Sequence, residues 1–200
     1  MKLYFVPQTR AFRAVWALEE VGEPYDLAEM TREEKVQAEH RERHPLGRVP
    51  VIDDGNGPIF ESSGIILHLA DLHPDKGLAP APGTHERALL YQWLFYAMTE
   101  IEVPLVEIYV QKVHRDQPDQ AVIDAAAERL KPALAVIEKQ LGEHDYLLEG
   151  GFSIADVVMG EMATFAGLME QVDGLVNLAA YLERLKARPA YQRASAVGVS

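Results

Sequence analysis

The sequence predicts an α/β domain followed by an all-helical domain. In the first third of the chain, short runs of β-branched and aromatic residues alternate with segments of helical period. A stretch rich in proline and glycine then interrupts the pattern at 74–85. After it, apolar residues recur with helical spacing to the end. We therefore expect one domain at 1–76, a linker at 77–85 and a helical domain at 86–200.

Local signals support each element of the first domain. Gly22 is suited to end a helix because glycine adopts the left-handed conformation readily. Thr31-Arg-Glu-Glu34 has the capping-box pattern of a helix start, and Asp54-Gly-Asn-Gly57 is typical of a hairpin turn. The expected order is a strand at 3–6, a helix at about 10–21, a strand at 25–27, a helix at about 31–43, strands at 49–52 and 58–60, and a helix at about 62–73, a βαβαββα arrangement.

The second domain is expected to contain only helices. A long helix at about 86–114 should kink at Pro104, and a helix at about 119–141 should bend or split at Pro132. Ser153-Ile-Ala-Asp156 has the spacing of a reciprocal cap, to which we assign a stabilising role. A last helix is expected at about 175–187.

Composition excludes several classes of function. The net charge of −12 and the isoelectric point near 5.0 argue against nucleic acid or an anionic membrane as a partner. The absence of cysteine excludes disulfides, thiolate metal sites and a cysteine nucleophile. His40 and His44 are four residues apart but lack a third ligand, so we expect a solvated helix face and no metal. No signal-like or membrane-spanning run is evident, so a cytoplasmic protein is expected.

One stretch, Arg48-Val-Pro-Val-Ile52, stands out as a candidate binding segment. A proline at the start of a buried strand removes a hydrogen-bond donor, and a cis Val49–Pro50 bond would turn the Val49 backbone outward. Such a backbone is suited to docking a peptide as an added strand. Glu61-Ser62 follows at the expected start of a helix, where amide groups favour a carboxylate. Together they predict a site for a small acidic peptide; the alternative is a trans bond and an ordinary helix cap.

This region resembles the glutathione site of the cytosolic glutathione S-transferase family, with a bacterial-type, Ser/Thr-like active-site loop. The resemblance lies in Pro45-Leu-Gly-Arg-Val-Pro-Val-Ile52 and Glu61-Ser-Ser-Gly-Ile-Ile-Leu-His-Leu-Ala-Asp71, and it extends over nearly the whole chain. It implies a thioredoxin-like N-terminal domain and an all-α C-terminal domain. It also implies glutathione as co-substrate, a small hydrophobic electrophile, a role in detoxification, a homodimer and no metal.

The resemblance assigns roles within the glutathione site. The Val49 backbone should pair with the cysteinyl part of glutathione, with Pro50 enforcing the geometry. Glu61 should hold the amine and Ser62 the carboxylate of the γ-glutamyl end. Arg48 should reach the glycyl carboxylate; the alternative for Arg48 is an exposed charge without a ligand.

Conjugation requires the glutathione thiolate, so the site must lower the thiol pKa. A decrease of about two units takes roughly 2.7 kcal/mol of preferential thiolate stabilisation. Thr9 is the first candidate because it occupies the hydroxyl position of the resembling families, although it could simply cap the first helix. Arg10 could stabilise a thiolate by charge or be a solvated arginine. Tyr4 is the third candidate, and packing is the alternative for it.

Two other functions remain open. A non-catalytic binding module could keep the same fold, since threonine replaces the serine of the resembling families. A glutathione-dependent isomerase is the other alternative, although its typical Ser-Ser-Cys loop is absent and this loop reads Gln8-Thr-Arg10. Retention on glutathione resin followed by an aryl halide assay would separate these functions.

Overall fold

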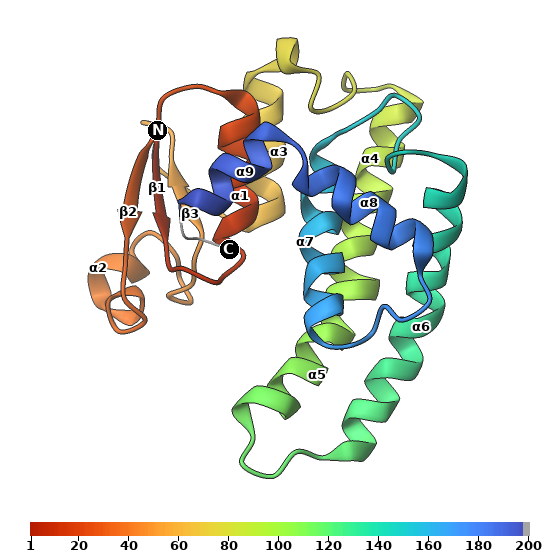
Figure 1. Cartoon of the computed structure of the whole chain (residues 1–200). Helices are drawn as coiled ribbons and strands as arrows, with labels where there is room; N and C mark the ends of the chain where they lie inside the picture. Colours follow the sequence, from red (N-terminus) through yellow and green to blue (C-terminus); the bar gives the residue numbers. More distant parts are fainter. Residues whose placement is uncertain (198–200) are drawn as a thin grey trace. The chain divides into compact units, whose positions relative to one another are not determined.

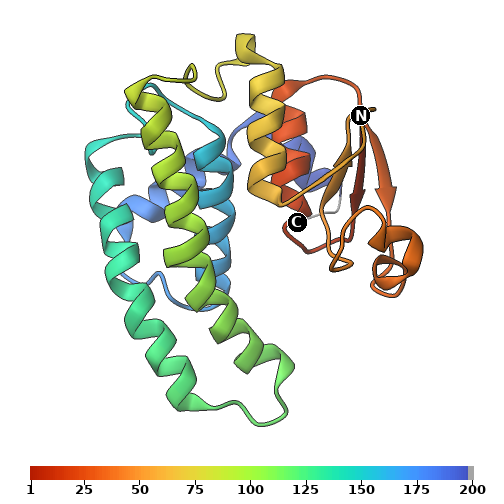
Figure 2. The same cartoon turned by 180° about the vertical axis from the view of Figure 1, so that it is seen from behind.

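The computed structural model describes residues 1–197 and contains two compact units. The first comprises Met1–Ala79 together with the C-terminal segment that begins at Lys186, and the second comprises Pro80–Leu185 (Figures 1 and 2). The two units divide between Ala79 and Pro80, within the linker that was expected at 77–85. The end of the chain differs from the expectation, because it packs with the first unit instead of completing the helical domain.

The first unit is built on a four-stranded mixed sheet with the order β2-β1-β3-β4. β1 pairs with β2 in parallel, while the β1–β3 and β3–β4 pairs are antiparallel. This arrangement confirms the thioredoxin-like domain. Its elements are β1 (Lys2–Phe5), α1 (Ala11–Val21), β2 (Asp26–Glu29), a 3₁₀ turn (Glu34–Val36), α2 (Ala38–Arg41), β3 (Val51–Asp53), β4 (Pro58–Phe60), α3 (Ser62–Leu72), a second 3₁₀ turn (Pro74–Lys76) and α9 (Pro189–Ala196).

Alternation along β1 separates the two faces of the sheet. Leu3 and Phe5 are buried, whereas Lys2 and Tyr4 point to the other face. Figure 1 shows α1 and α3 on one side of the sheet and α2 on the other. Nearly every residue of α1 is buried, and this helix ends as expected at Gly22, whose φ is 77°.

The expected helix over 31–43 is wrong. The capping-box bonds do form, since the Thr31 amide donates to Glu34 and the Glu34 amide donates to the Thr31 hydroxyl. However, they open only a 3₁₀ turn, and Gln37 is extended before the single turn of α2. The segment is polar throughout and has no apolar stripe to bury, so local capping alone does not stabilise a long helix here.

The second unit is helical, as expected. Its elements are α4 (His85–Tyr96), a π-helical segment (Ala97–Ile101), α5 (Glu102–His114), α6 (Gln120–Glu143), α7 (Ile154–Leu168) and α8 (Val176–Lys186, whose last residue belongs to the first unit). The irregular turn precedes Pro104, which has no amide hydrogen for the carbonyl four residues earlier. Pro132 lies inside α6 without splitting it.

The predicted reciprocal cap of α7 is present. The Ser153 hydroxyl accepts from the Ala155 amide at 3.3 Å, and the Asp156 carboxylate accepts from the Ser153 amide at 2.8 Å. Asp156 is fully buried and also accepts from the Leu147 amide and the Tyr181 hydroxyl, each at 3.0 Å. Since a buried carboxylate needs such donors, this network supports the assigned stabilising role.

Helix α9 was not predicted, and it covers the outer surface of α1. The Tyr191 ring packs edge-on against Phe12 and Trp16, with centroid separations of 5.4 and 4.8 Å. Arg188 makes a two-fold ion pair with Glu20 at 2.7 and 2.8 Å. This packing explains why the end of the chain belongs to the first unit.

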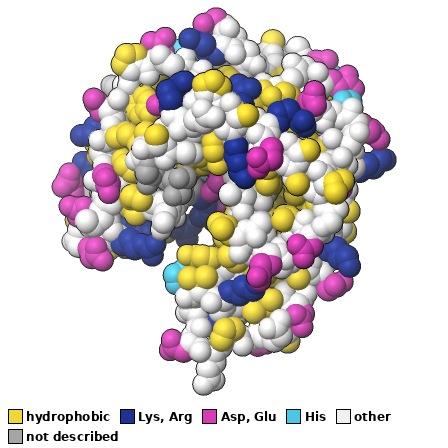
Figure 3. All heavy atoms as spheres, in the orientation of Figure 1, with side chains coloured by type: hydrophobic (Ala, Val, Ile, Leu, Met, Phe, Trp, Pro, Cys, Tyr) yellow, Lys and Arg dark blue, Asp and Glu magenta, His cyan; other side chains and the backbone are white. Residues whose placement is uncertain are grey.

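Acidic and basic side chains are interspersed over the face seen in Figure 3.

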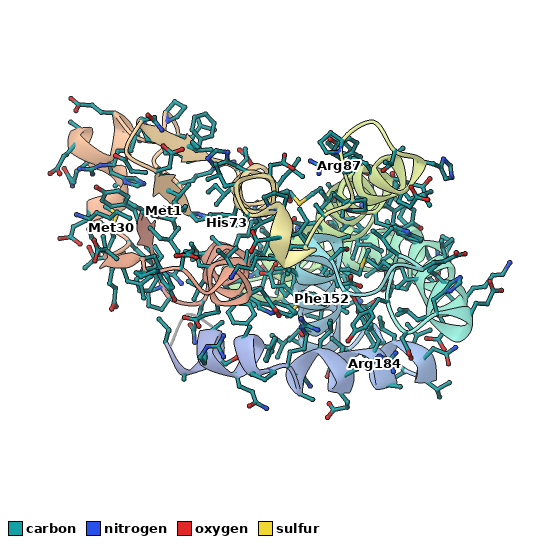
Figure 4. All side chains as sticks on the ribbon, turned by 90° about the horizontal axis from the view of Figure 1, so that it is seen from above. Met1, Met30, His73, Arg87, Phe152 and Arg184 are labelled. Atoms are coloured by element: carbon teal, nitrogen blue, oxygen red, sulfur yellow. The ribbon has the colours of Figure 1, made fainter. Side chains whose placement is uncertain are left out.

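Figure 4 shows Arg184 on α8, where its guanidinium carbon lies 5.9 Å from the ring centroid of Tyr146. Within residues 1–197, no helix combines the length and apolarity that crossing a bilayer requires.

Candidate active site

The Val49–Pro50 bond is cis, as the sequence predicted. The strand begins later than expected, because the ladder of β3 starts at Val51. Val49 is half-buried and lies outside this ladder, and within residues 1–197 its backbone forms no hydrogen bond. Its amide and carbonyl groups are therefore left for a guest.

Strand register determines what lies beside Val49. Val51 is paired with Phe60 in β4 and with Tyr4 in β1. On one flank, the Val51–Phe60 pair is the last of the β3–β4 ladder, so the segment before β3 and the start of α3 lie at the same end of the sheet. On the other flank, Val51 pairs with Tyr4, so the chain before β3 and the chain after β1 lie at the same end of the sheet. Neighbouring strands are about 4.8 Å apart. The three candidate segments of the first unit therefore converge at one end of the sheet.

A buried histidine holds the chain just before Val49. His40 is 1% exposed, and its Nε2 lies 2.8 Å from the Arg48 carbonyl oxygen. Because a carbonyl only accepts, Nε2 must carry the proton and donate. Gly47 has a φ of 60°, and an added Cβ there would lie 2.7 Å from the Lys35 carbonyl oxygen. These contacts fix the approach to Val49 and leave the Arg48 side chain exposed.

The expectation of a solvated His40–His44 face is therefore wrong. His44 is 4% exposed, and its ring packs against Phe60 with a centroid separation of 4.7 Å. Burial lowers the His44 pKa, while the nearby Glu61 carboxylate opposes this shift. Four-residue spacing alone did not reveal that this polar segment turns its histidines inward. Among the described residues, no cluster of three or more metal-ligating side chains occurs.

Glu61 and Ser62 form the start of α3. Glu61 has a φ of 73° and an exposed side chain, and its carbonyl accepts from the Ile65 amide at 2.9 Å. Ser62 is 3% exposed, and its Oγ accepts a hydrogen bond from Nη1 of the buried Arg13 at 3.1 Å. The first amide groups of an α-helix have no acceptor within the helix. An anion can therefore be bound at this helix start.

Thr9 lies in the loop between β1 and α1. Its hydroxyl donates to the Val6 carbonyl at 2.7 Å and accepts from the Ala11 amide at 3.3 Å. The hydroxyl therefore participates in the start of α1, in agreement with the alternative that it caps this helix. To donate to a thiolate, it must rotate away from Val6. The Arg10 side chain, one residue later, is exposed.

The Tyr4 side chain contacts different residues from those that Thr9 contacts. The Arg43 guanidinium carbon is 4.4 Å from the Tyr4 ring centroid, and the His40 ring centroid is 6.3 Å away. Since alternate strand residues face opposite sides of a sheet, Tyr4 points toward α2. Its contacts are those of a packed, cation-covered ring, which corresponds to the packing alternative.

A cavity of about 490 Å³ adjoins the loop that contains Thr9. It is lined by both polar and apolar groups. These come from the loop after β1, from the last residue of β2 and from the segment that follows β2. They are Val6, Pro7, Gln8, Glu29, Met30, Thr31, Arg32 and Glu34. Figure 4 labels Met30, the first residue after β2. The cavity is open space beside the loop that leads to Thr9.

Comparison with known proteins finds the same family in both parts of the chain. The family model described as the glutathione S-transferase N-terminal domain matches residues 1–71, and the one described as the C-terminal domain matches residues 120–184. The chain is 34% identical to glutathione S-transferase 4 of Zea mays over 190 residues, which cover 89% of this chain and 83% of that protein. It is 30% identical to the probable glutathione S-transferase GSTF1 of Oryza sativa subsp. japonica, with 94% and 92% covered.

Solved structures agree over the full length. BphK, a bacterial glutathione S-transferase described as a ternary complex, has a TM-score of 0.89 and 27% identity, covering 99% of each chain. A sphingomonad glutathione S-transferase complexed with glutathione has a TM-score of 0.87 and 26% identity, covering 100% of each chain. Fold and sequence thus define a two-domain transferase. The chain belongs to the cytosolic glutathione S-transferase family.

Proposed function

We propose that this protein binds glutathione in its first unit and transfers it to a small hydrophobic electrophile. The observation that carries the proposal is the register of β3, which brings Val49, the start of α3 and the Thr9 loop to one end of the sheet. The open Val49 backbone receives the cysteinyl part, as an added strand would. Glu61 takes the amine, Ser62 the γ-glutamyl carboxylate and Arg48 the glycyl carboxylate.

The thiolate is generated by groups at the start of α1. The amides of Ala11, Phe12 and Arg13 are already bonded within this turn, so the mobile donor is the Thr9 hydroxyl. When it rotates from the Val6 carbonyl to the sulfur, the thiol proton is lost to solvent and the helix dipole favours the anion. The Arg10 cation adds to this field. The thiolate then forms a bond to an electrophilic carbon, and a leaving group such as halide departs with the bonding electron pair.

A non-catalytic glutathione-binding module is the second candidate. It is favoured by the 2.7 Å hydrogen bond from Thr9 to Val6, because this bond occupies the only proton of the hydroxyl. In that case the Val49 and Ser62 contacts would still bind glutathione. The cytoplasm, where glutathione is a co-substrate, is the proposed location, and a homodimer is the proposed assembly.

Glutathione resin and an aryl halide assay test the proposal together. We expect retention, elution by free glutathione and turnover that falls in Thr9→Ala. Arg115→Ala, at an exposed position of the second unit, is the matched control and should behave as the unaltered protein. Retention with equal turnover in Thr9→Ala would remove the role of the hydroxyl. Retention without turnover on many electrophiles would favour the binding module, and a folded protein that is not retained would contradict both.

A further inference from the structure

Arg13 is a fully buried arginine that connects two distant parts of the candidate site. It is the third residue of α1, and its Nη1 donates to Ser62 Oγ at the start of α3, 49 residues away. A buried guanidinium is costly unless its donors are satisfied. The Ser62 hydroxyl is one of the groups that satisfy these donors, at 3.1 Å from Nη1.

The chemistry of this bond sets the direction of the Ser62 hydroxyl proton. A guanidinium has donors but no acceptor, so Ser62 must accept from Arg13. The hydroxyl proton consequently points elsewhere and can be donated. Ser62 is also the first residue of α3, where the amide groups of the first turn have no acceptor within the helix. The hydroxyl and these amides thus present donors at the same helix start.

The positive charge of Arg13 also favours an anion at the start of α3. Polarisation by the guanidinium makes the Ser62 hydroxyl a stronger donor, since hydrogen bonds in a chain strengthen one another. A cation next to a helix N-terminus also favours a negative group bound there. This electrostatic effect is weakly screened because Arg13 is inaccessible to solvent.

We propose that Arg13 is a positioning residue that holds the Ser62 hydroxyl toward the α-carboxylate of the γ-glutamyl group. This inference rests on the proposed function. It predicts that Arg13 determines specificity for thiol peptides with a carboxylate at that end. It also predicts an effect on glutathione affinity, and hence KM, with kcat little changed, because Arg13 acts on a part of the ligand remote from sulfur.

Isothermal titration with two ligands tests the inference. Glutathione is compared with γ-aminobutyryl-cysteinyl-glycine, which keeps the amine and the thiol but lacks the α-carboxylate. The protein variants are Arg13→Lys, which keeps the charge but loses the planar fork, Ser62→Ala, and the double variant. We expect Arg13→Lys to weaken glutathione binding about tenfold and to leave binding of the analogue unchanged. The double variant should be no weaker than Ser62→Ala.

The outcomes that would contradict the inference differ from the outcome that would contradict the proposed function. Equal weakening of both ligands in Arg13→Lys would show a merely structural role, and unchanged glutathione binding would refute the inference while the proposed function stands. If the unaltered protein bound no glutathione, the proposed function itself would fail.

A measurement on the unaltered protein avoids any folding defect of the variants. The ¹⁵N-labelled guanidinium signal of Arg13 should shift with glutathione and stay in place with the analogue. A signal that responds to both ligands alike, or to neither, would overturn the inference.

Discussion

Val51 and Phe60 are antiparallel partners in β3 and β4, and the residues next to this pair, Pro50 and Glu61, belong to the proposed glutathione site. Pro50 continues one strand and Glu61 the other, so the candidate peptide-binding backbone and the anion-binding helix start are neighbours. On the opposite flank, Val51 pairs with Tyr4, so the loop after β1, where Thr9 donates to the Val6 carbonyl, lies at the same end of the sheet. The site therefore depends on strand register more than on any single side chain.

The hydroxyl of Thr9 should control the thiol pKa of bound glutathione. We expect Thr9→Ala to raise this pKa by about one unit or more and to lower kcat/KM about tenfold at neutral pH, because a donor worth roughly 1.4 kcal/mol or more is lost. Thr9→Ser should retain the low pKa. The pH dependence of thiolate absorbance in the bound state measures it. A pKa in Thr9→Ala equal to that of the unaltered protein would assign activation to another group.

The exposed guanidinium of Arg48 should contribute to glutathione binding through its charge. We expect Arg48→Ala to weaken binding several-fold, by about 1 kcal/mol, and to reduce the dependence of affinity on salt. Titration calorimetry at low and high salt measures both effects, with Arg115→Ala as the control for net charge. If the two variants lost the same affinity, Arg48 would be a solvated charge without a ligand.

Acid should destabilise the first unit through His44. Burial lowers its pKa in the folded state, so below about 6.5 the unfolded chain binds a proton that the folded chain does not. Stability then falls as the pH decreases from about 6.5 toward the lower folded-state pKa, and it is fully present above that window. Urea unfolding across this range should show a shallower loss for His44→Leu than for the unaltered protein. An identical slope in both would refute a neutral, buried His44.

Helix α9 should stabilise the first unit. Tyr191→Ala removes two aromatic contacts, and we expect it to lower the free energy of unfolding by about 3 kcal/mol. Arg188→Ala leaves the mostly buried Glu20 carboxylate without its two-fold partner and should cost about 2 kcal/mol.

Arg129→Ala is the matched control for these changes at α9. It removes a more exposed ion pair with Glu107, and we expect a loss below about 0.5 kcal/mol. Urea unfolding measures all three variants. Losses at Tyr191 and Arg188 as small as that at Arg129 would mean that α9 does not support the first unit.

Features encoded by a few neighbouring residues were predicted well. The C-terminal glycine of α1, the reciprocal cap of α7 and the cis bond before Pro50 all follow from local residue types. The same local reasoning failed over 31–43, where a real capping box begins a segment without an apolar face. Capping determines where a helix can start, whereas packing determines how far it continues.

Contacts between residues that are far apart in the chain could not be predicted from the sequence. The residues next to Arg13 in the sequence do not indicate Ser62 as its partner. The sequence pattern predicted a solvent-exposed His40, whereas in the fold its ring faces the Arg48 carbonyl. The packing of Tyr191 on Trp16 likewise joins the end of the chain to its beginning. A buried charged or aromatic residue can be suspected from pattern, but its partner follows only from the topology.

Titration of ¹⁵N-labelled protein with S-methylglutathione, monitored by backbone amide shifts, tests the central claim most directly. We expect the amides of Val49, Ser62 and Ser63 to shift together and saturate at a single affinity, because one tripeptide contacts both segments. Shifts confined to one of the two segments, or saturation at two different affinities, would contradict a shared site at this end of the sheet.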